Sequence, residues 1–428
     1  MSRMVERLPS WFSVDADDLD AKQKPTHADV ELQIAYAYNV IRTIEPNSNE
    51  AEAVLGWLAR NRERLKLNNR LFTSGDAGRG QEPRRLTGPI SITRWKRLKV
   101  TLRARVKRRQ AKPASELTIG LTAVTGALGL GGLDAALFHL IYRYRLDNHF
   151  ERLLDGLAEA QGRNSVLRRY PDLFALLIGG NASEINLRFR ADAPLIDSGA
   201  LRVDEDGDIQ VSSRLVVLIE ACAANDTDVR AELLGRPRKA SLDWASFRHL
   251  GEAIEIARRV LIKAVAGGER GVHVLFYGPP GTGKTECAAS LADSLGLKLH
   301  VIGENGPSGR EPSRGDRLSD LLLAQRLAGD SGDTLYLFDE AEDLFRPRAY
   351  DREPDPKIFV HRLLETAKVP IIWAANDIEA FSPAVLRRMT QCIEVRLPPQ
   401  SRRAELWQDL AEAENVELDA ATALRLAR

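Results

Sequence analysis

Eight consecutive residues in the C-terminal half of the chain have the types and spacing of a phosphate-binding loop. They are Gly278, Pro279, Pro280, Gly281, Thr282, Gly283, Lys284 and Thr285. An apolar run at 272–277 precedes them and a helix-like stretch at 286–295 follows, which gives the order strand, glycine turn, helix. In this arrangement backbone N–H groups face a phosphate chain, Lys284 places its charge on the outer phosphates, and the Thr285 hydroxyl reaches Mg²⁺. The stretch therefore predicts a nucleotide site.

A pair of carboxylates follows the apolar run at 334–338. Asp339 and Glu340 come at the end of a predicted buried strand. There Asp339 is expected to hold Mg²⁺, largely through water, and Glu340 to polarise an attacking water molecule. Glu342 and Asp343 are expected to begin the next helix rather than to take part in the chemistry.

The next predicted strand, at 369–374, leads to Asn376. An amide at a strand end, beside the strand that carries the metal ligand, can orient the attacking water or contact the outermost phosphate. We therefore expect Asn376 to be a further catalytic residue.

These motifs resemble the Walker A, Walker B and first sensor motifs of the AAA+ ATPases, most nearly those of AAA-type and Lon-like modules. The resemblance covers about residues 242–428 and implies an ATP hydrolase that uses ATP and Mg²⁺. It also implies a homo-oligomeric ring, commonly of six subunits, in which an arginine reaches the γ-phosphate bound to the neighbouring subunit. Arg388 is the first candidate for this arginine and Arg387 the second, with a surface salt bridge as the alternative.

Two features depart from the family pattern. Residues 302–333 contain no Phe, Tyr or Trp, whereas AAA+ unfoldases carry an aromatic pore loop there, so threading of a polypeptide is in doubt. The small helical lid begins near Ser401 and the sequence ends at Arg428, before the expected second-sensor arginine. We therefore expect a truncated lid.

The alternation of predicted strands and helices after about residue 241 indicates an α/β fold, with a parallel P-loop NTPase sheet and crossover helices. A mainly helical region precedes it. The chain is too long for one ordinary core. We predict four segments: a helical region with a linker and a basic stretch (1–114), a helical, winged-helix-like domain (115–240), the ATPase core (241–400) and the start of the lid (401–428).

A basic stretch at 94–112 contains no acidic residue. One interpretation is a surface for nucleic acid, anionic lipid or an acidic protein. The other is a solvated helix whose apolar residues Trp95, Leu98, Leu102 and Val106 pack on the body of the protein. A hairpin is predicted around the acidic turn at 204–208. Because that turn would repel phosphate, a protein-interaction or structural role is favoured over DNA recognition.

Composition excludes several classes of protein. The chain has 61 Lys and Arg against 60 Asp and Glu, so its overall charge gives no argument for a polyanionic partner. Three widely spaced cysteines exclude a disulfide scaffold and fit a cytoplasmic location. The apolar stretch at 117–142 is expected to form two helices broken at Gly131 and Gly132, with Asp134 capping the second, rather than a membrane span.

Three functional hypotheses follow. The first is an ATPase that remodels a protein partner recruited through residues 1–240. The second is a nucleotide-controlled assembly scaffold with slow hydrolysis. The third is a DNA-linked AAA+ factor that uses the basic stretch. The sequence does not identify the protein partner.

Overall fold

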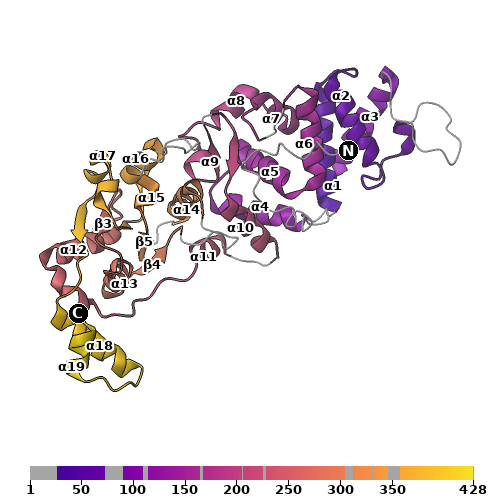
Figure 1. Cartoon of the computed structure of the whole chain (residues 1–428). Helices are drawn as coiled ribbons and strands as arrows, with labels where there is room; N and C mark the ends of the chain where they lie inside the picture. Colours follow the sequence, from indigo (N-terminus) through magenta and orange to yellow (C-terminus); the bar gives the residue numbers. More distant parts are fainter. Residues whose placement is uncertain are drawn as a thin grey trace, which may run out of the picture. The chain divides into compact units, whose positions relative to one another are not determined.

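The computed structural model covers most of the chain, and Figure 1 labels its helices and strands. The residues that it describes are 27–72, 90–108, 114–163, 167–204, 206–224, 228–303, 312–328, 332–345 and 357–427. The chain divides into two compact units. One consists of the chain up to Thr122 with Gly131–Arg188, and the other of Ala123–Leu130 with the chain from Phe189 onward. The segment boundaries predicted after residues 114, 240 and 400 stay a proposal.

The first unit is helical, as the sequence predicts. Its helices are α1 (His27–Thr43), α2 (Asn49–Arg60), α3 (Ile92–Arg108), the first part of α4 (Glu116–Ala127), α5 (Gly132–Leu146), α6 (Asn148–Ala160), α7 (Pro171–Ile178) and α8 (Ala182–Leu187), with a short 3₁₀ turn, η2 (Asn69–Leu71). Helix α1 packs against α3 and α7, and α2 packs against α6. The apolar faces of these amphipathic helices are thus buried against one another.

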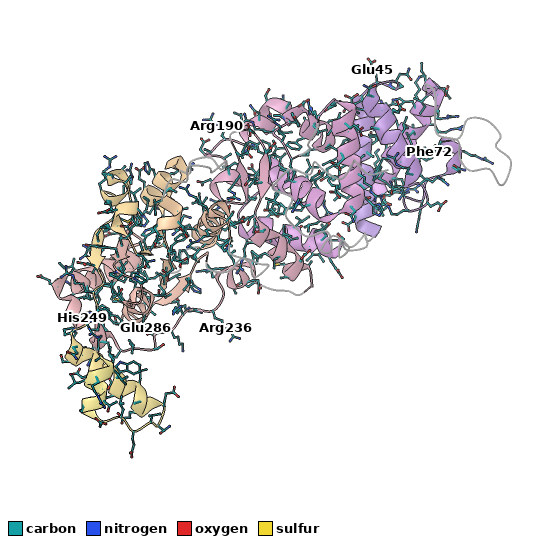
Figure 2. The ribbon with its side chains drawn as sticks, in the orientation of Figure 1. Glu45, Phe72, Arg190, Arg236, His249 and Glu286 are labelled. Carbon is teal, nitrogen blue, oxygen red and sulfur yellow. The ribbon has the colours of Figure 1, made fainter. Side chains whose placement is uncertain are left out.

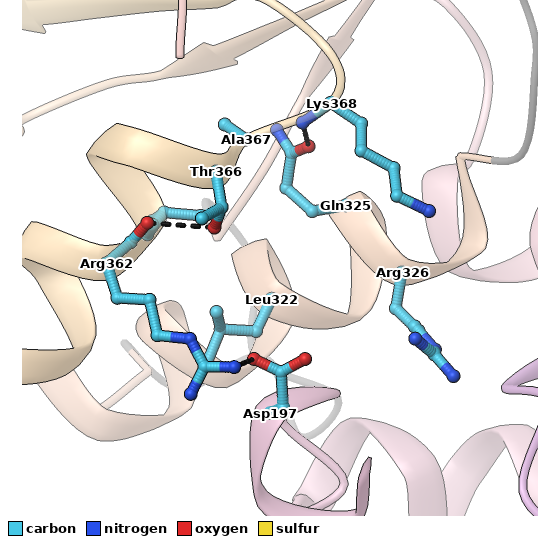
Figure 3. Close-up of a pocket in the computed structure, with 9 residues that line it drawn as sticks. Asp197, Leu322, Gln325, Arg326, Arg362, Thr366, Ala367 and Lys368 are labelled. Atoms are coloured by element: carbon cyan, nitrogen blue, oxygen red, sulfur yellow. Dashed lines mark hydrogen bonds and ion pairs between the residues drawn. The ribbon is translucent and has the colours of Figure 1, made fainter. Parts of the chain in front are cut away.

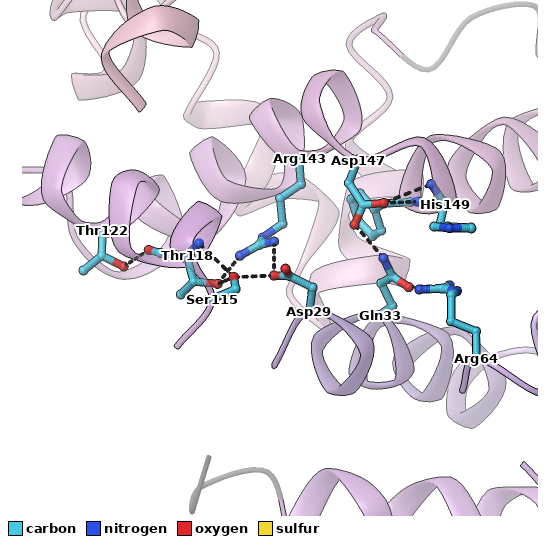
Figure 4. A network of polar contacts seen from close by, with 10 residues as sticks. Asp29, Gln33, Arg64, Ser115, Thr118, Thr122, Arg143, Asp147 and His149 are labelled. Carbon is cyan, nitrogen blue, oxygen red and sulfur yellow. Dashed lines mark hydrogen bonds and ion pairs between the residues drawn. The ribbon is translucent and has the colours of Figure 1, made fainter. Parts of the chain in front are cut away.

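A buried ion pair joins two helices of this unit. The Arg143 guanidinium, only 1% exposed, donates to Oδ1 of Asp29 at 2.9 Å. The Ser115 hydroxyl donates to the same oxygen at 2.6 Å, and Figure 4 shows this group of side chains. Because breaking a buried pair leaves an uncompensated charge, these contacts fix how α1 and α5 pack.

The basic stretch forms helix α3. Trp95, Leu98 and Leu102 are buried at helical spacing, which confirms the packing interpretation for these three residues, whereas Val106 is half-buried. The Arg105 guanidinium pairs with Glu31 of α1 and is therefore engaged inside the unit. Five cations of α3 are exposed: Lys96, Arg97, Arg103, Lys107 and Arg108. Residues 109–112 of the stretch lie outside the described residues.

The apolar stretch at 117–142 forms two helices, α4 and α5, separated at the glycines as predicted. Within the described residues, none of the helices combines the length and the apolar character that crossing a membrane requires. The predicted cap is wrong: Gly131 is the N-cap of α5 and no side chain caps the helix. Asp134 lies inside the first turn, buried, with Oδ2 at 3.3 Å from a nitrogen of Arg188.

The second unit begins with α9 (Pro194–Asp197) and the predicted hairpin. Strands β1 (Leu201–Val203) and β2 (Ile209–Val211) pair antiparallel, with Arg202 opposite Gln210. Two helices follow the hairpin, α10 (Ser213–Ala224) and α11 (Val229–Leu234). Helix α11 begins separately because the Asp228 side chain accepts from the Arg230 N–H and caps it.

Five parallel strands form the sheet of this unit, in the order β4-β5-β6-β3-β7. They are β3 (His273–Tyr277), β4 (Lys298–Val301), β5 (Thr334–Phe338), β6 (Ile371–Ala375) and β7 (Gln391–Glu394). The helices and 3₁₀ turns around them are η4 (Trp244–Leu250), α12 (Glu252–Gly267), α13 (Lys284–Ser294), α14 (Arg314–Leu327), α15 (Glu342–Phe345), α16 (Lys357–Thr366), η5 (Ile378–Ala380) and α17 (Pro383–Leu386). This arrangement confirms the predicted P-loop NTPase sheet with crossover helices.

Both faces of the sheet are buried. In β3, Leu275 belongs to one apolar core, whereas its neighbours Val274 and Phe276 belong to the other. Because all strands run the same way, the segments that leave β3, β5 and β6 emerge at one edge of the sheet. The sheet therefore gathers the residues that follow these three strands.

The chain ends in two helices, α18 (Gln400–Ala413) and α19 (Ala420–Leu426), which pack against each other around Ala404 and Ala423. They lie where the start of a helical lid is predicted, and the assignment of this segment as a lid stays a proposal. The segment that precedes the sheet is also held in place. The Glu286 carboxylate of α13, labelled in Figure 2, accepts a hydrogen bond from the Leu242 N–H at 2.7 Å. The segment before η4 is thereby attached to the helix that follows the phosphate-binding loop.

Candidate nucleotide-binding site

The phosphate-binding loop connects β3 to α13. Gly278 leaves the strand with φ 146°, and a Cβ there would lie 2.6 Å from the carbonyl oxygen of Val395, so the loop has room only for glycine. Gly283 has φ 84° and is the N-cap of α13, which begins at Lys284. The glycines thus set the turn that points the first N–H groups of α13 out of the loop.

The Lys284 side chain lies across the loop and is only 8% exposed. Its ammonium group donates to the carbonyl oxygens of Gly278 at 2.9 Å and Pro279 at 3.0 Å, and to Oδ1 of Asn376 at 2.9 Å. Burial lowers the pKa of this ammonium group, and the charges of Asp339 and Glu342 oppose the shift. A cation is therefore held where the outer phosphates of a nucleotide would lie.

The Walker B strand brings its first carboxylate to the same place. The Thr285 hydroxyl donates to Oδ2 of Asp339 at 2.5 Å. Two side-chain oxygens from residues 54 positions apart in the sequence thus meet beside the loop. This is the pairing that the sequence predicts for a metal-binding position.

Glu340 has an unusual backbone conformation and an exposed side chain. Its φ is +49°, in the left-handed region that few residues other than glycine adopt. Its N–H donates to Oδ1 of Asp339 at 2.9 Å. The conformation turns the Glu340 carboxylate away from the buried strand and toward solvent, where a water molecule can reach it.

Arg317 of α14 holds this turn in place. Its guanidinium donates to the carbonyl oxygen of Asp339 and, at 3.4 Å, to that of Glu340. It also lies over the ring of Phe338, 4.5 Å from the centroid, and 3.7 Å from a carboxylate oxygen of Asp343. Since strained conformations persist only where the surroundings fix them, Arg317 stabilises the shape of the Walker B turn.

Asn376 lies between the lysine and a second acidic side chain. Oε1 of Glu342 accepts from the backbone N–H of Asn376 at 3.1 Å and from its Nδ2 at 2.9 Å. Glu342 begins helix α15, as expected, and it also contacts the predicted sensor residue Asn376.

Sequence reasoning did not predict the contacts that Arg317 and Glu342 make at this site. Arg317 is one of many arginines in the chain, and a bond to a backbone carbonyl leaves no sequence motif. The signal for Glu342 was its place two residues after Glu340, at the end of a strand that neighbours the Asn376 strand.

The two candidate arginines for a neighbouring site follow α17. The Arg388 guanidinium pairs with Glu365 at 2.7 Å and donates to the carbonyl oxygen of Ala384 at 2.8 Å. Arg387 is exposed. Arg388 is thus held within its own chain, while the Arg387 side chain faces solvent.

A recess of about 90 Å³ lies elsewhere in this unit, between α9, α14 and α16 (Figure 3). Arg362 pairs there with Asp197 at 2.8 Å, and the Gln325 amide bonds to the backbone of Lys368 at 2.9 Å. These contacts tie the helices together, and none of the predicted site residues is among those that line the recess.

Comparison with known proteins agrees with this geometry. Residues 274–397 match the family model described as "ATPase family associated with various cellular activities (AAA)". An "AAA ATPase forming ring-shaped complexes" of Corynebacterium efficiens is 31% identical over an alignment of 154 residues, and the match covers 31% of this chain and 29% of that protein. The "ATPase family AAA domain-containing protein 3" of Caenorhabditis elegans is 33% identical over 143 residues, covering 31% of this chain and 23% of that protein.

Among solved structures, the RuvB Holliday junction branch migration motor of Thermotoga maritima aligns with 41% of this chain and 55% of its own, with 22% identity and a TM-score of 0.32. The chain spans less than a third of the length of either curated relative. The matches to the curated relatives extend over about 150 residues, and the family model lies within the unit that contains the sheet. The part of the chain that contains the sheet, at residues 274–397, is therefore similar to the ATPases of the AAA family.

Proposed function

We propose that the protein hydrolyses ATP to ADP and phosphate with the help of Mg²⁺ and uses this reaction to remodel a protein partner. The observation that carries the proposal is the convergence of three side chains from different strand ends. Lys284, Asp339 and Asn376 follow β3, β5 and β6, and hydrogen bonds connect the lysine to Asn376 and Thr285 to Asp339. This convergence supports a phosphoryl-transfer site.

ATP binding in this proposal uses the loop and the start of α13. Backbone N–H groups of residues 281–285 surround the phosphate chain, and Lys284 exchanges neutral carbonyl oxygens for phosphate oxygens. A phosphate oxygen carries negative charge, so it adds a Coulombic attraction to the ammonium group that a neutral carbonyl oxygen does not supply. The exchange therefore favours the nucleotide complex.

Hydrolysis uses the exposed carboxylate of Glu340. The water oxygen attacks the γ-phosphorus while Glu340 accepts a water proton, and the bond from phosphorus to the bridging oxygen breaks. ADP leaves with the bonding electron pair. Asn376 orients the water or the γ-phosphate from the other side, and Lys284 stabilises the charge that develops on the phosphate oxygens.

The residues beside the loop fit Mg²⁺. Proteins usually bind this ion through one or two carboxylates, with substrate phosphates and water completing the octahedron. The Thr285 hydroxyl and the Asp339 carboxylate are hard oxygen ligands that already lie 2.5 Å apart. Mg²⁺ bound by them would neutralise charge on the phosphates.

A ring of identical subunits is part of the proposal, since the relative from Corynebacterium efficiens is named for ring-shaped complexes. Arg388 remains the first candidate for the arginine that reaches the neighbouring γ-phosphate, and Arg387 the second. To do so, Arg388 has to exchange its bond to Glu365 for one to phosphate. The remodelled protein would be recruited through residues 1–240.

A second candidate function is a nucleotide-controlled assembly scaffold with slow hydrolysis. The absence of Phe, Tyr and Trp from residues 302–333 favours it over polypeptide threading. The ATP turnover rate and the oligomeric state distinguish a scaffold from a remodelling motor. A scaffold changes oligomeric state with ATP and turns over less than about once a minute, whereas a remodelling motor is stimulated by its partner.

ATP affinity tests the proposed site. Binding of a fluorescent ATP analogue is expected to weaken at least about 100-fold in Lys284→Ala, because several charge-assisted bonds are lost. Lys263→Ala, which removes an exposed cation from α12, is the matched control and should bind as the wild type does. Equal affinity of Lys284→Ala and the control would contradict the site.

A further inference from the structure

The first residue of α15, Glu342, is a buried carboxylate two positions after the exposed Glu340. Glu342 is only 9% exposed, and its Oε1 accepts both hydrogen bonds from Asn376 described above. Its other oxygen, Oε2, is buried and has no hydrogen-bond partner among the described residues. Since burying a carboxylate is costly, a contact that uses only one oxygen calls for a reason.

The contacts on both sides of Asn376 determine how its amide is turned. A carboxylate only accepts hydrogen bonds and an ammonium group only donates them. The Asn376 nitrogen must therefore face Glu342, and its oxygen must face Lys284, which is the arrangement observed. Without Glu342, the amide could rotate and present either atom to the loop.

The backbone contact adds a second constraint. Asn376 follows directly after β6, where the parallel ladder ends, and its side chain is exposed. Glu342 accepts from its N–H as well as from its side chain, so one carboxylate oxygen fixes the position and the orientation of the residue together. Two bonds to a single charged acceptor are stronger than bonds to a neutral group.

We propose that Glu342 is a positioning residue that holds the Asn376 amide oxygen toward the phosphate-binding loop, in the orientation needed for ATP hydrolysis. This inference rests on the proposed function, since it assigns a role within that reaction. Glu342 acts through Asn376 and does not itself contact the reacting atoms. A misplaced catalytic group costs rate without removing the contacts that bind substrate.

A double-mutant cycle tests the role. Glu342→Ala and Asn376→Ala are each expected to lower kcat about 10- to 100-fold, with KM for ATP within about 3-fold of the wild type. The double variant should be no slower than the slower single variant, because both changes remove the same oriented amide. The inference would be overturned if the fold-loss of kcat in the double variant equalled the product of the two single losses. A rise in KM for ATP with unchanged kcat would also overturn it.

Conservative replacement separates positioning from general stability. In Glu342→Gln, the amide oxygen can accept both bonds while the amide nitrogen takes the place of the unpartnered Oε2, so kcat should stay within about 3-fold. Glu379→Ala removes an exposed carboxylate from η5, three residues after Asn376, and should leave kcat unchanged. A Glu342→Gln protein as slow as Glu342→Ala would contradict a role based on hydrogen bonding.

A measurement without turnover separates this inference from the proposed function. Hydrogen exchange in the peptide that contains the end of β6 should be faster at Asn376 in Glu342→Ala, and unchanged in Glu342→Gln and Glu379→Ala. An unchanged exchange rate at Asn376 in Glu342→Ala would contradict the positioning role of Glu342 and leave the proposed ATPase function unaffected. If the variants show the expected exchange rates but the wild-type protein hydrolyses no ATP, the proposed function would be contradicted and the contact made by Glu342 would stand.

Discussion

The ammonium nitrogen of Lys284 lies 2.9 Å from Oδ1 of Asn376, which connects the phosphate-binding loop to the end of the neighbouring strand β6. Two loop carbonyls accept the remaining hydrogen bonds of the lysine. All three donors of the ammonium group are therefore engaged by neutral oxygens before a phosphate arrives. When ATP takes their place, the Glu342 carboxylate still holds Asn376.

Arg317→Met is expected to lower kcat about 10-fold or more with little change in KM for ATP. Methionine keeps an apolar contact with Phe338, but it cannot bond to the carbonyl oxygens of Asp339 and Glu340, so the left-handed turn at Glu340 loses its support. Steady-state ATPase kinetics measure the effect. Arg326→Met, at the far end of α14, is the control, and a kcat within 2-fold in both variants would show that the turn holds without Arg317.

The chemistry-bearing motifs could be predicted because each depends on local order. The sequence shows an apolar run directly before each motif, at Gly278–Thr285, Asp339 and Asn376. Parallel strands then bring these strand ends together at one edge of the sheet. The contacts of Arg317 and Glu342 could not be predicted, because they join separate elements through single side chains. The strand order, which places β3 between β6 and β7, is likewise a tertiary property.

The predicted cap of helix α5 failed because the position of its carboxylate depends on tertiary contacts. Asp134 has the residue type of a helix cap, yet α5 begins earlier, at Gly132, and tertiary packing turns the carboxylate toward Arg188. Farther along the chain, Asp228 is the N-cap of α11, which separates this helix from α10. The position of Asp134 thus depends on a contact that the local pattern does not contain, whereas the cap at Asp228 is a local contact with the Arg230 N–H.

Arg388→Ala is expected to leave ATP affinity nearly unchanged and to lower kcat about 10-fold or more, because it removes positive charge from the neighbouring active site. Adding Glu340→Gln subunits should partly restore turnover, since they supply Arg388 to competent neighbours. Turnover of the mixture, compared with each variant alone, measures this. Arg387→Ala, which removes the second candidate arginine, is measured in the same way for comparison. Absence of rescue, or a loss of ATP affinity in Arg388→Ala, would indicate a structural role for the Glu365 pair.

The stability of the protein is expected to fall as pH rises from about 4 to 7 because of Asp320 on α14. Burial raises the pKa of this carboxyl from 3.8 to about 7, against the opposing effect of Arg214 and Arg202 and with a smaller contribution from Asp316. The folded state therefore keeps a proton that the unfolded state releases above pH 4, and the stability linked to it is lost as pH approaches 7. The effect is at most about 4 kcal/mol.

Asp320→Asn should flatten this pH dependence and raise the melting temperature relative to the wild type at pH 8. Melting temperatures at several pH values between 4 and 8 measure it. Asp409→Asn, which changes an exposed carboxylate of α18, should keep the wild-type slope. An Asp320→Asn slope equal to that of the control would show that Asp320 is ionised in the folded protein.

Helix α3 is expected to bind polyanions weakly, without sequence preference and with steep salt dependence. Its exposed cations face solvent, but no base-reading element accompanies them within the described residues. Fluorescence anisotropy with duplex DNA at two salt concentrations should show weaker binding by the triple variant Lys96→Gln, Arg103→Gln, Lys107→Gln. The control removes three other exposed cations of the same unit, Arg60, Lys66 and Arg70. Tight binding at physiological salt, or ATPase stimulation by DNA, would favour the DNA-linked hypothesis.

The central claim is that the Walker residues hydrolyse ATP, and the most direct test compares phosphate release and ATP retention in the wild type and in Glu340→Gln. The account predicts that the wild type releases phosphate in the presence of Mg²⁺ and stops when the metal is chelated. Glu340→Gln should bind ATP as tightly but release phosphate at least about 100-fold more slowly, because an amide cannot accept the proton of the attacking water. Undiminished phosphate release by Glu340→Gln, or none by the wild type, would contradict the account.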